Sequence, residues 1–278
     1  MKRIIFAAAV LLVATGASAD CEFTAARNLD ISAESLAQFK LQTRAGDLRI
    51  TGVPGAKQIE LRGKACASSA DALAQLTLQQ NRDGSMLHVV TTAPEDNGGF
   101  KLFGSNYAYI DLEVRMPQAL ALDLEDSSGD VEIENAGAME VRDSSGDIEI
   151  RGARGDVFIS DSSGDIEVDQ SEGNVTVRSD SSGDIRIEGA RRDVLVDEDS
   201  SGDIRIDDVS GNARVNHDSS GDIRFRRIGG NAEVGSDSSG SIVADKVKGD
   251  FSVRDKSGGR SGIDYSDVGG KVSLPERD

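Results

Sequence analysis

From residue 126 onward, short stretches of alternating apolar and polar residues recur along the chain. Each of seven successive units carries two apolar residues, separated by one polar or outward residue, after a Gly-containing turn. A second such pair follows eight or nine residues later. Alternation with a period of two is typical of β-strands that bury one face. The pattern therefore predicts two short strands in every unit. The first pairs begin at Val131, Ile148, Ile166, Ile185, Ile204, Ile223 and Ile242, and the second at Met139, Val157, Val175, Val194, Ala213, Ala232 and Phe251.

The turns before the first strands are nearly identical. Asp-Ser-Ser-Gly-Asp occurs six times, and a variant at 237–241 and a degenerate copy at 255–259 follow, with starts 17 to 19 residues apart. Short strands with Gly-rich corners at this period predict a parallel β-solenoid, in which equivalent residues of successive coils stack about 4.8 Å apart. A β-propeller needs about 40 residues per blade and a calcium-binding nonapeptide roll about nine per repeat, so the period excludes both. The six identical copies begin at Asp126, Asp143, Asp161, Asp180, Asp199 and Asp218.

The chain is predicted to be all-β, with an irregular N-terminal β cap and a solenoid of about eight coils. Residues 20–125 form the cap and a first divergent coil, because residues 44–50 resemble the repeated strand start. A β-hairpin is expected around residues 76–90 and one helical turn at residues 69–75. Residues 126–278 form the repeat solenoid, which ends in a partial coil.

The N-terminus has the pattern of a secretory signal peptide at residues 1–19. A basic start at residues 2–3 precedes an apolar stretch at 4–13 and a small-residue cleavage site at 17–19. The acidic residue before Cys21 argues against a lipid anchor, and no later segment is long and apolar enough to span a bilayer. The protein is expected to be exported to the periplasm or the cell exterior.

Cysteine usage agrees with export. Only Cys21 and Cys66 are present, and two thiols in an exported chain are expected to form a disulfide. They lie far in sequence from His88 and His217, so they do not form a zinc site, which needs about four close ligands.

Composition limits the kinds of partner. Aromatic residues make up 4% of the chain and Trp is absent, which suits a core made of stacked Ile and Val side chains. The formal net charge is −18, and removal of the leader makes it two units more negative. Such an acidic surface repels phosphate backbones, so nucleic-acid binding is excluded.

The repeated Ser-Gly-Asp-Ile strand starts, the leader and the irregular β segment before the coils resemble the bacterial "putative adhesin" family of exported β-solenoid proteins. The resemblance covers most of the mature chain and is strongest over residues 126–274. It implies a fold and export, and it carries adhesin as a functional label. It brings no catalytic residues with it.

No catalytic constellation is recognisable. Only His88 and His217 could serve in a Ser-His-Asp arrangement, and His217 lies where neighbouring units place a variable corner residue. Some polysaccharide-cleaving enzymes are β-helices, but they concentrate acidic residues in one cleft, whereas here the acids are spread over all units. A carbohydrate-active enzyme is therefore the second alternative, and a non-enzymatic interaction scaffold for a protein or polysaccharide surface partner is the preferred function.

The turn aspartates allow a structural and a functional interpretation. In the structural one, the first Asp accepts backbone N–H groups, Gly supplies a positive φ and the serines bond locally. In the functional one, stacked carboxylates attract weakly bound divalent cations, with calcium preferred to magnesium, which makes a cation-binding module the first alternative. The outward residue after the turn changes from Glu in the first three units to Arg in the next three, so the first three are expected to present unbalanced acid. The candidate metal ligands are Asp130, Glu132, Asp147, Glu149, Asp165 and Glu167.

Overall fold

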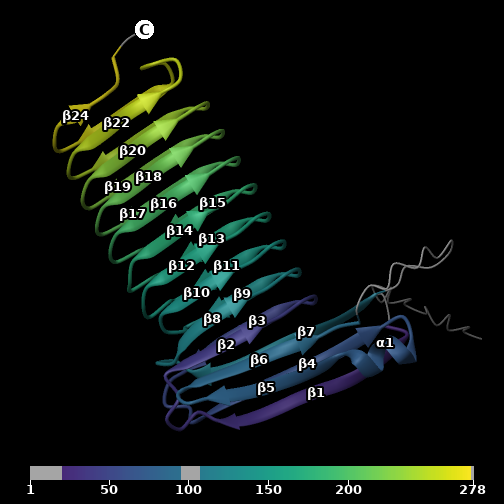
Figure 1. Cartoon of the computed structure of the whole chain (residues 1–278). Helices are drawn as coiled ribbons and strands as arrows, with labels where there is room; N and C mark the ends of the chain where they lie inside the picture. The colour runs from purple at the N-terminus through teal and green to yellow at the C-terminus, as the bar shows by residue number, and fades with distance from the viewer. Residues whose placement is uncertain (1–20, 95–106, 277–278) are drawn as a thin grey trace, which may run out of the picture.

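Two long β-sheets face each other along the whole molecule in the computed structural model of the chain, which describes residues 21–94 and 107–276. Each sheet has twelve strands, and successive coils climb in regular steps from the cap to the C-terminus (Figure 1). The parallel β-solenoid of about eight coils is therefore confirmed for the repeat region. The expected signal peptide at residues 1–19 lies outside the described residues.

We call the two layers sheet A and sheet B. Sheet A contains, in spatial order, β1 (Phe23–Ser32), β4 (Gln58–Ala67), β7 (Ala108–Pro117), β3 (Leu48–Val53), β9 (Val131–Glu134), β11 (Ile148–Arg151), β13 (Ile166–Asp169), β15 (Ile185–Glu188), β17 (Ile204–Val209), β19 (Ile223–Ile228), β21 (Ile242–Val247) and β23 (Ile263–Val268). Sheet B contains, from the opposite end, β24 (Val272–Ser273), β22 (Phe251–Lys256), β20 (Ala232–Asp237), β18 (Ala213–Asp218), β16 (Val194–Asp199), β14 (Val175–Ser179), β12 (Val157–Ser160), β10 (Met139–Arg142), β8 (Ala121–Glu125), β2 (Gln38–Gln42), β6 (Met86–Thr92) and β5 (Thr77–Asp83).

Each coil consists of one strand of sheet B, a first corner, one strand of sheet A and a second corner. The Asp-Ser-Ser-Gly-Asp turn forms the first corner, and the shorter apolar-centred turn forms the second. Equivalent residues pair in parallel register, for example Ile185 with Ile204 and Val194 with Ala213. Because each coil repeats the same alternation, the Ile and Val side chains of both sheets point inward and form one continuous core.

Glycine at the first corner is required by the close approach of neighbouring coils. Gly202 has a φ of +130°, and a Cβ placed on it would lie 1.7 Å from the carbonyl oxygen of Gly183 in the preceding coil. Every other glycine of the Asp-Ser-Ser-Gly series also has a positive φ. The repeat therefore keeps Gly at this point for both conformation and space.

The N-terminal segment extends the solenoid and then covers its end. β3, in the segment expected to be a divergent copy of the repeated strand, pairs in parallel with β9. β1 and β4 add antiparallel strands to sheet A, and β5 adds one to sheet B, where it forms the expected hairpin with β6. The expected helical turn is α1 (Ala70–Gln75), which Ser69 caps by accepting the N–H of Ala72.

A disulfide links Cys21 to Cys66 on β4, with 5.6 Å between their Cα atoms, which confirms the predicted pairing. It ties the start of the described chain to the antiparallel strands of the cap. In the described part of the chain no helix is long and apolar enough to cross a membrane.

The final coil starts one residue later than the sequence indicated. The degenerate turn was expected to begin at Asp255, but the register pairs Asp237 with Lys256 and Ser236 with Asp255. Residue type alone points to Asp255 because it is the nearest Asp to the expected position. Lys256 therefore occupies the position that Asp holds in the seven preceding units.

Candidate functional site

The first Asp of each first corner points into the molecule. These side chains form what we call the inner aspartate column, and their residues are between 2% and 6% exposed. Backbone N–H groups of the following serines donate to four of them, Asp143, Asp199, Asp218 and Asp237, as Ser201 does to Asp199 at 3.2 Å and Ser220 to Asp218 at 3.1 Å. The structural interpretation of the first Asp is confirmed by these bonds. The column consists of Asp126, Asp143, Asp161, Asp180, Asp199, Asp218 and Asp237.

Most carboxylate oxygens of the column have only part of their hydrogen-bonding capacity filled. Both oxygens of Asp161 and Asp180 and one oxygen of each of the other five residues are buried without a hydrogen bond among the described residues, although the Asp237 oxygen faces Lys256. Burial raises the pKa of Asp126, Asp161, Asp180 and Asp199 to about 6, and the neighbouring carboxyls add to this effect. The same causes raise the pKa of Asp218 to about 7. These five carboxyls therefore take up protons as the pH falls through about 7 and 6.

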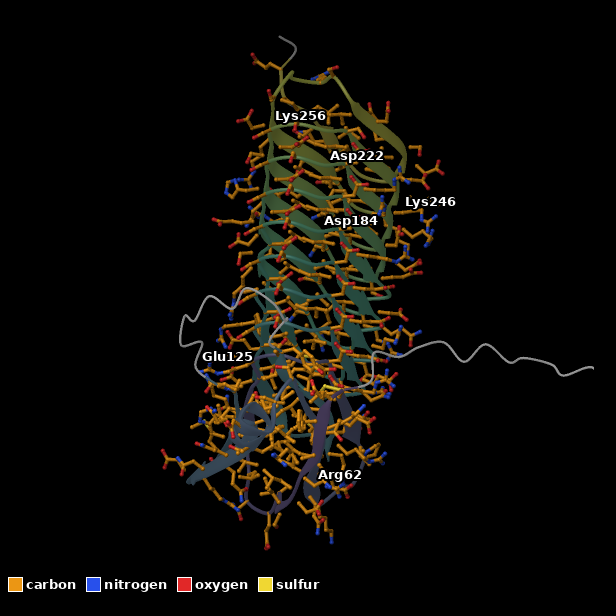
Figure 2. All side chains as sticks on the ribbon, turned by 90° about the vertical axis from the view of Figure 1, so that its right-hand side faces the viewer. Arg62, Glu125, Asp184, Asp222, Lys246 and Lys256 are labelled. Atoms are coloured by element: carbon orange, nitrogen blue, oxygen red, sulfur yellow. A yellow bond between two sulfur atoms is a disulfide. The ribbon has the colours of Figure 1, made fainter. Side chains whose placement is uncertain are left out.

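The two ends of the column are closed by different residues. At the N-terminal end the hydroxyl of Thr43 donates to the Asp126 carboxylate. At the C-terminal end Nζ of Lys256 lies 3.1 Å from Oδ2 of Asp237. Figure 2 shows Lys256 at that end, with Asp184 and Asp222 one above the other farther along the solenoid.

The serines of the turn bond between coils, which corrects the expected local bonding. The second serine of a turn donates its hydroxyl to the backbone carbonyl of the first serine in the preceding coil, as Ser201 does to Ser181 at 3.0 Å and Ser220 to Ser200 at 3.1 Å. The sequence could not show this because the acceptor is about 20 residues away. The serines thus hold neighbouring corners together.

The last Asp of each first corner also bonds between coils. Its Oδ1 accepts a hydrogen bond from the backbone N–H of the equivalent residue in the next coil. Asp165 accepts from Asp184 at 2.8 Å, and Asp184 accepts from Asp203 at 2.9 Å. Each such carboxylate satisfies a corner N–H that no strand ladder reaches. We call this series the outer aspartate row. It consists of Asp111, Asp47, Asp130, Asp147, Asp165, Asp184, Asp203 and Asp222.

A second row of the same kind lies at the second corner, and the sequence analysis missed it. Here Asp or Asn precedes the sheet B strand and accepts the N–H of its successor, as Asp193 does from Asn212 at 2.7 Å. The signal was present as an Asp or Asn at a spacing of 18 or 19 residues. The row consists of Asp156, Asn174, Asp193, Asn212, Asn231 and Asp250.

The six candidate metal ligands lie together on the outer face of sheet A. Glu132, Glu149 and Glu167 stack in register on β9, β11 and β13, and Asp130, Asp147 and Asp165 precede them at the corner. In the described part of the chain, no three His, Cys, Asp or Glu side chains converge in a metal-binding arrangement. The six residues therefore form a surface and not a closed coordination sphere.

The expected excess of unbalanced acid in the first three coils is wrong for the glutamates. Glu132 pairs with Arg49 at 2.5 Å and with Arg151 at 3.2 Å, Arg151 also pairs with Glu149, and Arg186 lies 3.6 Å from Glu167. Arg49 and Arg186 come from the neighbouring strands β3 and β15 and Arg151 lies at the end of β11, so one outward position per strand does not show these pairs. Asp130, Asp147 and Asp165 keep no ion pair among the described residues, whereas Asp184 and Asp203 share Arg205.

A groove of about 920 Å³ crosses this acidic surface where the cap joins the coils. Its walls carry both signs of charge, with Asp47, Asp111 and Asp147 opposite Arg49 and Lys64. Burial raises the pKa of the Asp111 carboxyl, although the N–H of Asp47 bonds to it. The groove offers donors and acceptors to a polar ligand.

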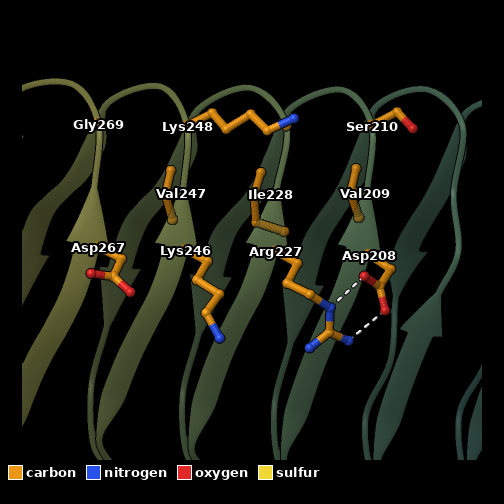
Figure 3. A pocket seen from close by; sticks show the side chains of 11 residues that line it. Asp208, Val209, Ser210, Arg227, Ile228, Lys246, Val247, Lys248, Asp267 and Gly269 are labelled. Carbon is orange, nitrogen blue, oxygen red and sulfur yellow. Dashed lines mark hydrogen bonds and ion pairs between the residues drawn. The ribbon is translucent and has the colours of Figure 1, made fainter.

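A shallower groove follows the second corner near the C-terminus. Its floor is made of Val209, Ile228 and Val247, and Figure 3 shows the bidentate ion pair of Arg227 with Asp208 beside them. Lys246 projects from the next coil and lies 3.6 Å from Asp245. Both signs of charge therefore lie along this edge, with Arg227 and Lys246 between Asp208 and Asp267, in contrast to the acidic first corner.

The two histidines lie in different places. His88 on β6 is 2.7 Å from the amide oxygen of Gln42, and Nδ1 of His217 is 2.8 Å from the Ser236 hydroxyl on an exposed coil. His217 pairs in register with Glu198 and Ser236, so the variable corner position is confirmed.

Several solved structures align with most of this chain. A "putative lipid binding protein" from Parabacteroides distasonis aligns over 90% of this chain and 96% of its own, with 16% identity and a TM-score of 0.48. A "putative adhesin" from Bacteroides fragilis aligns over 91% and 97%, with 13% identity and a TM-score of 0.36. A "putative cell adhesion protein" from Clostridium sporogenes aligns over 90% and 99%, with 8% identity and a TM-score of 0.35.

Comparison with curated protein sequences gives no match. One family model, Toastrack DUF4097, matches residues 138–276. This region runs from the second corner of the first repeat unit to the end of the described chain. It covers half of the sequence and nearly all of the regular coils. The chain therefore belongs to the Toastrack DUF4097 family.

Proposed function

We propose that this protein is an exported, non-enzymatic interaction scaffold that binds a protein or polysaccharide on a surface of the cell envelope. The observation that carries the proposal is the pair of continuous twelve-stranded sheets, whose outer residues repeat in register from coil to coil. A rigid surface with a period of about 4.8 Å suits an extended partner that repeats its own hydrogen-bonding groups.

The distribution of polar groups supports binding over catalysis. In the outer aspartate row one carboxylate oxygen of each residue accepts a backbone N–H. Glu132 on sheet A forms ion pairs with arginines. Catalysis needs acid and base groups that converge on one reacting atom. The repeated groups here instead offer the same contact many times, which favours avidity.

Export is supported by the leader pattern at residues 1–19 and by the Cys21–Cys66 disulfide. Disulfides persist in oxidising compartments and are rare in the bacterial cytoplasm. Cell fractionation of a strain that makes the full chain is the direct measurement of its compartment.

Binding is tested with purified protein and isolated envelope fractions. We expect saturable binding that falls at least about tenfold when the outer face of sheet A is changed by Arg186→Ser, Arg205→Ser and Arg224→Ser together, because each change removes a strong donor to the partner. The matched control changes the outer face of sheet B by Leu195→Ser, Arg214→Ser and Glu233→Ser. Equal loss from both triples, or release of soluble sugar fragments from the fraction, contradicts the proposal.

A divalent-cation module is the second candidate, and the unpaired Asp130, Asp147 and Asp165 favour it. An open row supplies about two carboxylates per ion, with water completing the sphere, so calcium would bind weakly and in preference to magnesium. Ligand binding to the folded state alone raises the melting temperature.

We expect millimolar calcium to raise the melting temperature by a few degrees, because bound ions relieve repulsion along the outer aspartate row. Replacement of Glu132, Glu149 and Glu167 by Arg should abolish the shift. A matched triple on later coils, Arg186→Gln, Arg205→Gln and Arg224→Gln, should retain it. An unchanged melting temperature of the unmodified protein, measured by scanning calorimetry, eliminates the cation module and leaves the scaffold function intact.

A further inference from the structure

The inner aspartate column ends in a lysine. Lys256 takes the eighth position of the column, because β22 pairs with β20 in a register that places Lys256 beside Asp237. Nζ of Lys256 is 3.1 Å from Oδ2 of Asp237, and the two side chains are 3% and 0% exposed. An amine and a carboxyl group are thus held in contact in a site that excludes water.

The groups around this contact are arranged for chemistry at the Asp237 carboxyl. Oδ1 of Asp237 accepts the backbone N–H of Ser239 at 3.0 Å, whereas Oδ2 faces Nζ of Lys256 and has no other partner among the described residues. On its other side Asp237 stacks in register on Asp218. Burial and the neighbouring Asp199 and Asp237 raise the pKa of Asp218 to about 7, so Asp218 holds a proton at neutral pH for much of the time.

We propose that Lys256 and Asp237 condense to an intramolecular isopeptide bond that joins the last two coils of the solenoid. The Nζ–Cγ bond forms and the bond between Cγ and Oδ2 breaks. The ammonium and carboxylate together become a neutral amide, and one water molecule leaves. No oxidant, reductant or further reactant is needed, because all atoms of the product come from these two side chains.

Each neighbouring group has a defined part in this step. The Ser239 N–H stabilises the negative charge that develops on Oδ1 when nitrogen attacks, as a donor of an oxyanion hole does. The departing oxygen of Asp237 takes up two protons, as many as the ammonium loses, and the Asp218 carboxyl stacked beside it relays one of them by giving its own proton and regaining one from the ammonium. Contact in a rigid, dry site supplies the proximity that an amine and an acid lack in water, where this condensation is very slow.

The proposed bond lies near the C-terminal end of the solenoid. The antiparallel strands β1 and β5 cover the N-terminal end of the solenoid, and the disulfide fastens that end. At the other end the two-residue strand β24 is the last strand of sheet B. A covalent bond between residues 237 and 256 closes a loop of one coil and prevents this end from fraying.

The bond is tested on the full chain after export and purification, with the disulfide reduced before analysis. We expect the intact mass to be lower by one water molecule than the mass calculated for the same exported chain, without its leader, in the unlinked form. Trypsin should then yield residues 228–246 joined to residues 255–260, because an acylated Lys256 is not a cleavage site. An unmodified mass, together with a free peptide 257–260, overturns the proposal.

Variants separate the bond from a simple ion pair. Lys256→Met should restore the full mass, allowing for the substitution. Asp218→Asn keeps the shape of the side chain and should leave most of the chain unlinked, because the proton donor is lost. Asp180→Asn is the matched control in the same column and should remain linked. A linked Asp218→Asn chain would overturn the assigned role of Asp218.

Discussion

Replacement of Ile204 by Asp should destabilise the protein by about 5 kcal/mol, a large part of the total stability of a typical domain. Ile204 is fully buried on β17 and lies between Ile185 and Ile223 in the core. The substitution removes an apolar side chain and places a carboxylate where no donor can reach it. Urea unfolding followed by circular dichroism measures the loss.

The adjacent residue supplies the control. Arg205 points outward and forms exposed ion pairs with Asp184 and Asp203, so Arg205→Gln should cost less than about 1 kcal/mol.

A solenoid also predicts that deletion of residues 180–198 leaves a folded, shorter protein, because Asp199 then follows Ser179 and Arg205 takes the place of Arg186 beside Glu167. Aggregation of the deletion variant alongside normal folding of Ile204→Asp would contradict a fold stabilised by nearest-neighbour coils.

The free energy of unfolding should rise by on the order of 5 kcal/mol when the pH falls from 8 to 5. Proteins whose carboxylates are paired or exposed do not show such a rise. Burial raises the folded-state pKa of five column residues to about 6 or 7, above the value of about 3.9 in an unfolded chain. The folded state then binds more protons than the unfolded state. Their contribution is complete below about pH 4 and is lost as the pH rises through 6 and 7.

The gain is limited at lower pH. Salt bridges and hydrogen bonds lower the pKa of Glu125 and Glu140, so protonation of these groups removes stability below about pH 4. Urea midpoints measured from pH 4 to pH 8 give the profile. The double variant Asp180→Asn and Asp199→Asn should be more stable than the unmodified protein at pH 8 and should show a flatter profile. The same slope in both proteins would show that the column does not bind the protons.

The candidate site was predictable where its members share one repeat position. The spacing of the turns placed Asp130, Asp147 and Asp165 in one row, and the alternation of Glu132 and Glu149 with inward Ile residues placed them on one outer face. The ion pairs were not predictable in the same way, because Arg49 comes from the irregular segment and Arg151 from a different position of the strand. Pairing depends on side-chain direction and reach across strands.

The sequence by itself determined the architecture. A period of 17 to 19 residues with Ile or Val at fixed offsets leaves one arrangement in which every apolar side chain is buried and every coil is equivalent. The disulfide, the hairpin and the divergent first coil followed from equally local signals.

Only the tertiary structure decided which aspartate of each turn is buried and what closes the column. Both Asp residues of Asp-Ser-Ser-Gly-Asp are polar turn formers, and the corner geometry alone turns Asp199 inward and Asp203 outward. In the same way the register of β22, which pairs Phe251 with Ala232, places Lys256 and not Asp255 against Asp237. Burial of a side chain and its contacts arise only when coils stack on one another, so the sequence of a single repeat does not determine them.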